Sequence, residues 1–247
     1  MAGRARTRAP AIESFDFAPG RVLLRKYEVL SRLGSGWEGE VYMLRELATG
    51  IERAGKFFFP QRNPGNRTAR AYARKLHRLR HCPIVIQYRT QETLLVRRTP
   101  VTFLVSDYVE GELLADWLAR QPGRRIDAFM ALHLLHALAE GVECIHGARE
   151  YHGDLHSDNV IVRQVGLGFE IKLIDLFHSG PATAAAMRQD LVDLVHLLYE
   201  AVGGRRHYAR QPRQVKEIVC GLKRSLILRR YRTVRRLREH LERLEWD

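Results

Sequence analysis

Residues 151–162 read YHGDLHSDNVIV, a polar segment that runs directly into an apolar one. Two histidines, two aspartates and an asparagine lie within residues 152–159. The apolar residues at the end predict a short strand, so the polar residues occupy the loop that leads into it. Such a loop is either a simple turn or a place where acids and an amide do chemistry. The rest of the chain decides between these two interpretations.

The spacing of the polar residues favours chemistry. Asp154 and Asn159 are five residues apart, in the pattern H-x-D-x-x-x-x-N, and Asp175 ends the expected strand EIKLID (170–175). Carboxylate and amide oxygens suit Mg²⁺, which takes one or two carboxylates together with substrate phosphates. A carboxylate can also accept a proton from a reacting hydroxyl group. The loop and the strand end together predict a site for a metal and a proton acceptor.

A glycine cluster lies nearer the N-terminus, in GSGWEG (34–39). Gly34, Gly36 and Gly39 form G-x-G-x-x-G, followed by Val41. Glycines let main-chain N–H groups approach phosphates closely, because no Cβ obstructs them. A dinucleotide-binding fold would need a helix after the glycines. Here the residues alternate as in a strand, which favours a hairpin that covers a nucleotide.

Lys56 lies in the apolar segment ERAGKFFFP (52–60), which predicts a third strand. Burying its ammonium is costly unless an anion lies beside it. The other interpretation is a lysine at the sheet edge whose charged end reaches water.

Composition limits the function classes. The chain has 247 residues, 45% of them hydrophobic, and a net charge of +13 with a sequence pI of about 10.1. Such charge favours acidic partners, namely nucleotides, nucleic acid, anionic lipid or acidic proteins, or else a solvated basic surface. No run reaches the roughly 18 apolar residues of a membrane span. The basic start lacks an apolar core, so no secretory signal is expected and the protein is predicted to be cytoplasmic.

The cysteines and the order of elements complete the picture. Cys82, Cys144 and Cys220 are far apart and lack zinc-site spacing, so unpaired thiols in a reducing compartment are expected. Residues 1–20 are expected to form a mobile tail or a surface strap. The patterns then predict strands at 27–44 (a hairpin), 52–60, 84–90, 101–109, 160–162 and 170–175, and helices at 68–81, 112–120, 127–148 and from 190 onward.

Taken in order, the glycine motif, the strand lysine, H-x-D-x-x-x-x-N and the strand-end Asp175 resemble the protein kinase superfamily. The resemblance covers about residues 22–243. It implies an α+β, bilobal fold: an N-terminal extension (1–20), a β-rich N-lobe with one helix and the connecting segment (21–109), and a helical C-lobe (110–247). Ser106 resembles the gatekeeper of the connecting segment. Asp190 resembles the anchor at the N-terminus of the central C-lobe helix.

The resemblance also implies ATP and Mg²⁺ as cofactors and a role for each matching residue. Lys56 would hold the α and β phosphates, and Asp154 would orient the acceptor hydroxyl and take its proton. Asn159 and Asp175 would ligate Mg²⁺. Val41, Ala54 and Ile161 would enclose adenine, and the main chains of Asp107 and Val109 would bind its edge. The implied nucleotide-binding residues are Gly34, Gly36, Gly39, Val41, Ala54, Lys56, Asp107, Val109 and Ile161.

The lysine's surroundings depart from the family pattern. In that family a glutamate on the N-lobe helix pairs with the strand lysine, but no acidic residue lies between Lys56 and Glu92. By spacing, the glutamate's place falls near Tyr72. Lys56 would then depend on Asp175, on the nucleotide or on another acid. Glu38, at the tip of the glycine hairpin, would repel the γ-phosphate unless its side chain points to water.

Other departures concern regulation. Gly153 stands where many protein kinases have an arginine that receives a phosphate on the activation segment. The strand-end motif is Asp175-Leu176-Phe177 rather than D-F-G, and no A-P-E motif is present. Residues 176–189 are all that lies between Asp175 and Asp190. The sequence therefore predicts no control by phosphorylation within 176–189.

Three functions remain open. The first is an ATP-dependent kinase of protein Ser/Thr residues. The second is a kinase of a small molecule, sugar or lipid, since H-G-D-L-H resembles the aminoglycoside and lipopolysaccharide-core kinases. The third is a pseudokinase scaffold, for which the run RRYRTVRRLR (229–238) could contact an acidic protein. Nucleic-acid binding has no support from aromatic residues interleaved with basic ones.

Overall fold

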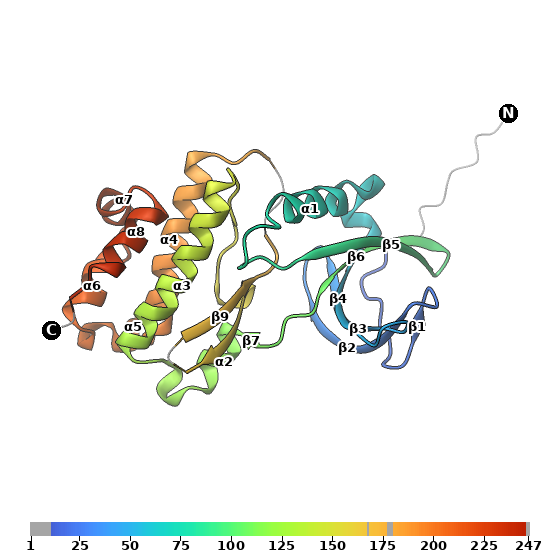
Figure 1. The fold of residues 1–247 in the computed structure, drawn as a ribbon, viewed down its shortest axis with the longest axis horizontal. Helices are drawn as coiled ribbons and strands as arrows, with labels where there is room; N and C mark the ends of the chain where they lie inside the picture. The colour runs from blue at the N-terminus through green and yellow to red at the C-terminus, as the bar shows by residue number, and fades with distance from the viewer. Residues whose placement is uncertain (1–10, 167, 177–179, 246–247) are drawn as a thin grey trace. The chain divides into compact units, whose positions relative to one another are not determined.

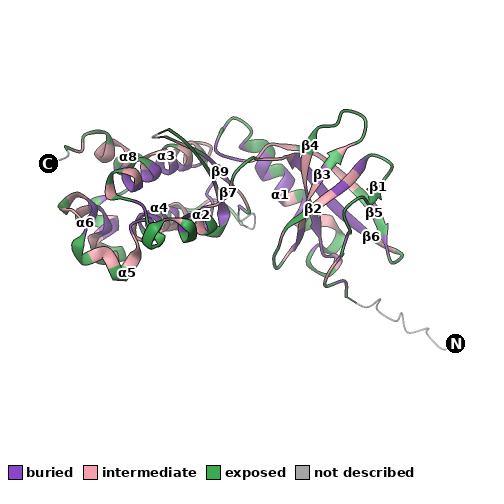
Figure 2. Ribbon diagram, turned by 90° about the horizontal axis from the view of Figure 1, so that it is seen from below, coloured by how far each residue is buried: buried purple, intermediate pink, exposed green. Residues whose placement is uncertain are grey.

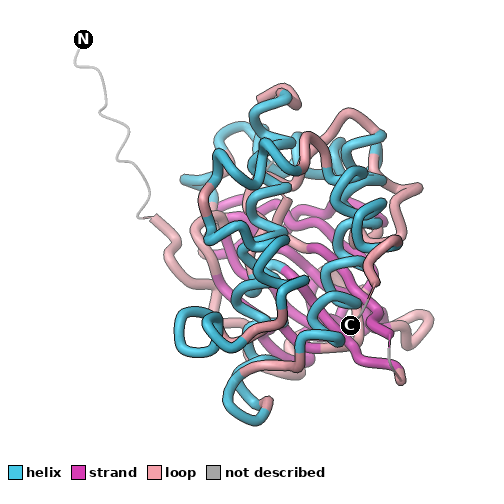
Figure 3. The backbone as a smooth tube through the Cα atoms, turned by 90° about the vertical axis from the view of Figure 1, so that its left-hand side faces the viewer, coloured by secondary structure: helices cyan, strands magenta, loops and turns pink. Residues whose placement is uncertain are grey.

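The computed structural model describes residues 11–166, 168–176 and 180–245. Its contacts divide the chain into two compact units, which are described separately. Unit 1 holds the described residues up to Arg74 together with Gln87–Tyr108, and unit 2 holds Lys75–Ile86 and the described residues from Val109 onward. Unit 1 is rich in strands and unit 2 in helices. Figure 3 shows the strands and helices of the chain by colour. The α+β class and the division into a β-rich and a helical part are therefore confirmed.

Unit 1 is built on an antiparallel sheet with strand order β1-β2-β3-β4-β6-β5 (Figure 1). Its strands are β1 (Val22–Leu23), β2 (Tyr27–Ser35), β3 (Gly39–Glu46), β4 (Glu52–Phe58), β5 (Tyr88–Val96) and β6 (Thr99–Asp107). The expected strand at 84–90 is misplaced, because β5 begins at Tyr88 and continues to Val96. Val85 instead forms a parallel bridge with Leu173 inside unit 2.

One face of this sheet carries the core of unit 1. Tyr42, Leu44 and Phe57 are buried there, and the Phe57 ring stacks on Phe103 with centroids 4.3 Å apart. The buried strand residues are visible in Figure 2. On the opposite face of β3 and β4, Val41 and Lys56 are half-buried, whereas Phe58 is fully buried.

The segment 11–20 lies against the core face as a strap. Ile12, Phe15 and Phe17 are each 3–4% exposed and belong to the same cluster of buried residues as Phe57. The strap also covers Glu40, which is fully buried and accepts hydrogen bonds from the Phe15 N–H (3.1 Å) and the Ser14 hydroxyl (3.0 Å). Of the two expectations for the N-terminal segment, the described part is therefore a strap, and one that completes the core.

Short 3-10 turns, η1 (Pro60–Arg62) and η2 (Pro64–Asn66), lead from β4 into α1 (Arg67–Arg78). Prolines begin both turns, which suits the first helical position because proline has no N–H to donate. The buried face of α1 carries Ala69, Tyr72 and Leu76. The last residues of α1, from Lys75, belong to unit 2.

Unit 2 is built around α3 (Ala128–Gly147), which packs against α4 (Ala184–Ala201) and α8 (Val234–Glu242) (Figure 1). The Asp127 side chain caps the start of α3 by accepting from the Met130 N–H. A small sheet of order β7-β8-β9 lies on the same unit. The remaining elements are β7 (Glu112–Leu113), α2 (Leu114–Arg120), η3 (Pro122–Arg124), η4 (Ser157–Asn159), β8 (Val160–Val165), β9 (Gly168–Leu173), α5 (Gly204–His207), η5 (Tyr208–Arg210), α6 (Arg213–Val219), η6 (Cys220–Leu222) and α7 (Arg224–Arg230).

Helix α3 is long and apolar enough to cross a membrane by length and composition, and it is alone in this among the described helices. A core helix of a globular unit passes the same test. Leu134, Leu138 and Val142 on α3 are each at most 1% exposed, which is how a core helix buries its apolar positions.

Cys82 and Cys144 are joined by a disulfide, which links the segment after α1 to α3 within unit 2. The expectation of unpaired thiols was wrong for these two residues, and only Cys220 is a free cysteine among the residues described. Their sequence separation of 62 residues concealed the pairing, because spacing alone does not show which elements pack together.

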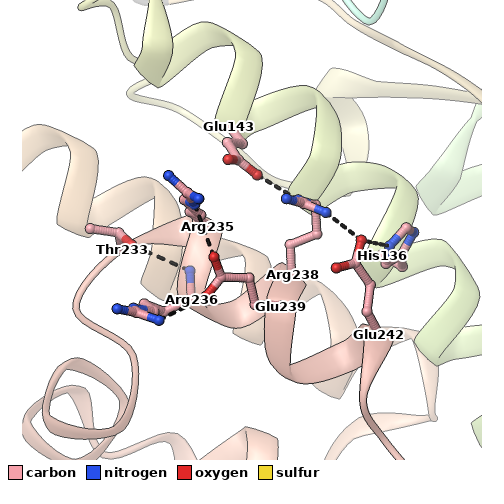
Figure 4. Close-up of polar contacts among 8 residues, drawn as sticks. All are labelled: His136, Glu143, Thr233, Arg235, Arg236, Arg238, Glu239 and Glu242. Carbon is pink, nitrogen blue, oxygen red and sulfur yellow. Dashed lines mark hydrogen bonds and ion pairs between the residues drawn. The ribbon is translucent and has the colours of Figure 1, made fainter.

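The arginine-rich run near the C-terminus forms α7, a short connection and α8. On α8, Arg235 and Arg236 both pair with Glu239, while Arg238 reaches Glu143 on α3 at 2.6 Å (Figure 4). The Arg238 contact ties the last helix to the central helix of unit 2. Arg235 and Arg236 remain 69% exposed, so much of their charge still faces solvent.

Candidate functional site

Asp190, a fully buried residue of α4, binds the main chain of the loop 151–159. The Asp190 carboxylate accepts hydrogen bonds from the main-chain N–H groups of His152 (2.7 Å) and Gly153 (2.8 Å). His146 lies 2.9 Å from the same carboxylate. Asp190 therefore anchors the loop, and it does so from inside α4 rather than from the helix N-terminus, where the sequence placed it. Gly153 has a φ of 85°, a left-handed conformation that favours glycine over arginine.

His152 is buried, and each of its two ring nitrogens takes part in a hydrogen bond. Its Nε2 donates to the Ile174 carbonyl at 3.1 Å, and its Nδ1 accepts from the Asp154 N–H at 3.3 Å. Burial lowers the pKa of His152 to about 4, so the ring is neutral at physiological pH. A neutral imidazole has one donor and one acceptor, and this loop uses both.

Asn159 and Asp154 contact each other across the loop. The Asn159 amide N–H group donates to the Asp154 carbonyl at 2.8 Å and to its carboxylate at 3.2 Å. Asn159 is 6% exposed, whereas the Asp154 side chain is 62% exposed. The buried asparagine thus fixes the aspartate by hydrogen bonds, while the Asp154 carboxylate remains exposed to solvent. The amide oxygen of Asn159 is the part of that side chain suited to a metal ion.

Asp175 is brought to the same place by the β8–β9 hairpin. Val160 pairs with Leu173, so Asn159 just before β8 and Asp175 just after β9 leave the same end of the ladder. Ile174 fixes this exit, because its N–H donates to the Asn159 carbonyl (3.1 Å) and its carbonyl accepts from His152. Asp175 itself is exposed and has a φ of 53°. This left-handed conformation is uncommon for a residue other than glycine.

Ile161 lies next along β8 and is half-buried, and Val109, also half-buried, belongs to the same unit. Four of the predicted residues, Asp154, Asn159, Ile161 and Asp175, therefore lie on one loop and the hairpin that follows it. Phe177 of the expected D-L-F motif lies outside the described residues. Leu176 is buried.

Lys75 is a residue of this region that the sequence pattern did not single out. It is 2% exposed, donates to the Tyr151 carbonyl, and has Glu150 3.8 Å away. Burial lowers the pKa of Lys75 to about 8, despite the nearby carboxylate. The sequence signal for its burial was its position three residues after Tyr72, on the apolar face of α1. This lysine ties the start of the loop to the end of α1.

A cavity of about 650 Å³ opens beside the loop in unit 2. Leu155 and His156 from the loop form one side of it. Its other lining residues include cations and carboxylates, namely Arg124, Arg206, Asp193 and Glu200.

The glycine motif in unit 1 forms the turn between β2 and β3, as the sequence predicts. The Gly36 N–H donates to the Gly39 carbonyl at 2.9 Å, which closes the turn. A Cβ on Gly39 would lie 1.8 Å from the Phe57 carbonyl oxygen, so this glycine is required by the approach of β3 to β4. Around Gly34 and Gly36 there is nothing within 4 Å of an added Cβ. These two glycines are the ones whose main chain is open to a ligand.

Val41, Ala54 and Lys56 lie together on the half-buried face of β3 and β4. Val41 pairs directly with Lys56, and Met43 pairs with Ala54. Directly paired residues place their side chains on the same face of a sheet. The predicted adenine-facing and phosphate-facing residues of unit 1 are thus neighbours.

Lys56 has an acidic partner, and it is Glu38. The Lys56 Nζ lies 3.1 Å from the Glu38 carboxylate, and their side chains are 14% and 27% exposed. The Glu38 carboxylate thus turns toward the lysine, and its expected repulsion of a γ-phosphate stays a prediction. The Tyr72 ring, where the family's glutamate was expected, has its centroid 4.7 Å from the same Nζ.

Asp107 ends β6, directly after Ser106. Its N–H donates to the Gln87 carbonyl at 3.0 Å, so its carbonyl is the main-chain group suited to a ligand. Arg89 binds the Asp107 carboxylate with two hydrogen bonds of 2.8 and 2.6 Å, which hold the pKa of that carboxyl below its usual value. The side chain thus fixes the end of β6, which positions the main chain.

Comparison with known families agrees with this site. The family model described as protein kinase domain matches residues 27–209, which is most of the chain. The matched range includes the glycine turn, Lys56, the loop 151–159 and Asp175. The chain belongs to the protein kinase family.

Curated relatives are similar at about 30% identity. A CBL-interacting protein kinase 29 from Oryza sativa subsp. japonica is 29% identical over 225 residues, covering 86% of this chain and 48% of the relative. A putative cyclin-dependent kinase F-2 from the same plant is 29% identical, covering 72% and 54%. The serine/threonine-protein kinase pkn2 of Myxococcus xanthus is 32% identical, covering 62% and 18%. The chain thus spans about half or less of the length of these relatives.

Proposed function

We propose that the protein is an ATP-dependent kinase that phosphorylates Ser or Thr residues of proteins. The observation that carries this proposal is the arrangement of Asp154, Asn159 and Asp175. An exposed carboxylate is held by a buried amide, and a second carboxylate leaves the adjacent strand in a left-handed conformation. Membership of the kinase family and the names of the similar proteins support the reaction class.

Each residue then has a chemical role. Asp154 would orient the acceptor hydroxyl and take its proton as the phosphoryl group transfers. Lys56 would bind the α and β phosphates, and the open main chain of Gly34 and Gly36 would approach the phosphates. In such a reaction most of the rate comes from positioning and charge neutralisation, because the protein does little covalent chemistry.

The residues present fit Mg²⁺. The amide oxygen of Asn159 and the carboxylate of Asp175 are hard oxygen donors at the same end of one hairpin, which suits a cation that also binds phosphate oxygens. When bound, Mg²⁺ would neutralise charge on the phosphates. Val41, Ala54 and Ile161 would contact adenine, while the main chains of Asp107 and Val109 would bind its edge.

The experiment follows transfer of labelled phosphate from Mg-ATP to a generic protein substrate. Asp154→Asn should lower the rate about 100-fold or more, since general-base groups contribute factors of this size. Asp158→Asn is the matched control, because this side chain is equally exposed on the same loop at 67% and should change the rate little. Transfer that is unaffected by Asp154→Asn would refute the assignment.

The cavity beside Leu155 and His156 favours one alternative, a small-molecule acceptor. ATP turnover that appears only with a small hydroxyl compound, and that Asp154→Asn abolishes, would support this second function. Nucleotide binding without transfer to any acceptor would instead indicate a scaffold. For such a scaffold, an acidic protein on the exposed arginines of α8 is the proposed partner.

We also propose that the activity does not depend on phosphorylation within residues 176–189. The hydroxyl side chains there are Ser179 and Thr183. The Thr183 hydroxyl accepts from the Ala186 N–H at 3.1 Å and thereby caps α4. The test combines Ser179→Ala with Thr183→Asn, which keeps a capping side chain but removes the phosphate acceptor. Full activity supports the proposal, and a loss of about tenfold or more in kcat would contradict it.

A further inference from the structure

Helix α1 lacks the glutamate that the family pattern places on it. This helix reads RTARAYARKLHR and contains no acidic residue, so it cannot supply a carboxylate to Lys56. The buried face of α1 instead places Tyr72 beside the lysine, with the ring centroid 4.7 Å from Nζ. An aromatic face attracts an ammonium, but more weakly than a carboxylate at hydrogen-bonding distance.

Glu38 supplies the missing charge from the glycine turn. Its carboxylate lies 3.1 Å from the Lys56 Nζ. Both residues belong to unit 1, and Glu38 lies in the turn between β2 and β3. Since the Lys56 side chain is only 14% exposed, an opposite charge at this distance offsets part of the cost of burying the ammonium.

The main chain of the turn fixes Glu38 in place. The Phe59 N–H donates to the Glu38 carbonyl at 2.8 Å, which extends the β3–β4 ladder beyond the Gly39–Phe58 pair. On the other side of Glu38, the Arg62 guanidinium stacks on the Trp37 ring, 3.0 Å from its centroid. The turn is therefore held to the segment after β4, and the carboxylate is delivered by a supported backbone.

We infer that Glu38 is the positioning residue that orients Lys56, in place of the glutamate that other members of the family carry on the N-lobe helix. The inference rests on the proposed kinase function and concerns how that same site is regulated. Because Glu38 directly precedes β3 and Lys56 lies on the adjacent β4, the lysine is oriented from within the sheet unit itself. Displacement of α1 would leave this ion pair intact, so the helix does not switch the site through the lysine.

The first measurement is a KM-against-kcat split for ATP with Glu38→Gln, which keeps the shape and removes the charge. A misplaced lysine should lower kcat by about 10- to 100-fold, with a smaller change in KM. Glu52→Gln is the control, because Glu52 is an exposed carboxylate on the same strand as Lys56 and should leave both constants unchanged. Unchanged kcat, or a Glu38→Gln variant that binds ATP more tightly and works faster, would overturn the inference and identify Glu38 as a competitor of the phosphates.

The second measurement is rescue from the helix. Adding Tyr72→Glu to Glu38→Gln returns a carboxylate to the lysine from α1 and should recover at least about a third of the lost factor in kcat on a logarithmic scale. Adding Tyr72→Phe is the matched control and should recover nothing. Rescue by both substitutions, or by neither while the variants remain folded by circular dichroism, would overturn the inference.

The third measurement does not require activity. Lys56 is labelled with an amine-reactive reagent in the absence of nucleotide, and labelling is quantified by mass spectrometry against pH. A neighbouring carboxylate favours the protonated amine, so Glu38→Gln should move the labelling midpoint to lower pH, whereas Glu52→Gln should not. An unmoved midpoint would overturn the ion pair. If Glu38→Gln moves the midpoint but the wild-type protein transfers no phosphate, the proposed function alone would be refuted.

Discussion

The loop 151–159 and the glycine turn 34–39 are both short polar segments between apolar ones, but they are held in different ways. The loop depends on groups distant in sequence, since Asp190 lies 38 residues beyond His152 and Lys75 lies 76 residues before Tyr151. The turn is held by its own hairpin and by the start of the segment after β4. The loop should therefore report on the packing of all of unit 2, whereas the turn should respond mainly to local changes.

The sharpest way to break this comparison is to remove the distant anchor of the loop. Asp190→Ala leaves the buried N–H groups of His152 and Gly153 without their acceptor. We expect the free energy of unfolding to fall by about 3–5 kcal/mol, with loss of phosphotransfer. Urea denaturation measures the change, and Glu140→Ala, an exposed α3 residue, should stay within about 0.5 kcal/mol of wild type. A loss below about 1 kcal/mol would show that the loop is held locally after all.

The disulfide is the second distant constraint on unit 2. Replacing Cys82 and Cys144 together by alanine should lower the free energy of unfolding by about 2–4 kcal/mol, because the link closes a long loop of the unfolded chain. A reducing agent should lower the stability of wild type and of Cys220→Ala by the same amount. The double variant should not respond to it, and any response there would contradict the pairing.

The glycine turn offers a local comparison among three residues of one motif. Gly39→Ala should cost about 2 kcal/mol, because its methyl group would overlap the Phe57 carbonyl oxygen and separate β3 from β4. Gly34→Ala and Gly36→Ala should change stability by no more than about 0.5 kcal/mol, since nothing lies near the added methyl. Thermal unfolding of the three variants measures this order, and equal effects would refute it.

The smallest expected effect concerns the pH dependence contributed by Lys75. Its pKa is lowered to about 8 in the folded protein, against 10.5 as the ordinary value, so the unfolded chain binds more protons between these values. Stability relative to Lys75→Met should therefore rise as the pH increases from 8 to about 10, by at most about 1 kcal/mol per pH unit. Denaturation of both proteins across this range tests the sign, and a falling difference would contradict the buried lysine.

Much of this site follows from sequence patterns because its parts are local. The alternation around the glycines predicted the hairpin, and the H-x-D-x-x-x-x-N spacing placed Asp154 and Asn159 on one loop. What the patterns missed depends on packing between distant segments. The link from Cys82 to Cys144 and the contact of Lys75 with Tyr151 both join α1 or its following segment to residues at least 62 positions away.

Glu38 was a different kind of miss, since it lies close to Lys56 in sequence. A regular hairpin tip was expected to point its side chain outward or toward the phosphates. In the structure the Glu38 carboxylate lies beside the lysine, and the Phe59 N–H just after β4 binds the Glu38 carbonyl. No periodicity encodes such a side-chain direction.

The N-terminal strap has a practical consequence for making this protein. The family match begins at residue 27, so a chain cut to that boundary would omit Ile12, Phe15 and Phe17. It would expose the aromatic face of Phe57 and leave the carboxylate of Glu40 without the Ser14 and Phe15 groups that bind it. Exposed aromatic surface of this kind promotes aggregation during expression. The folded kinase-family domain should therefore be produced from a start point before Ile12.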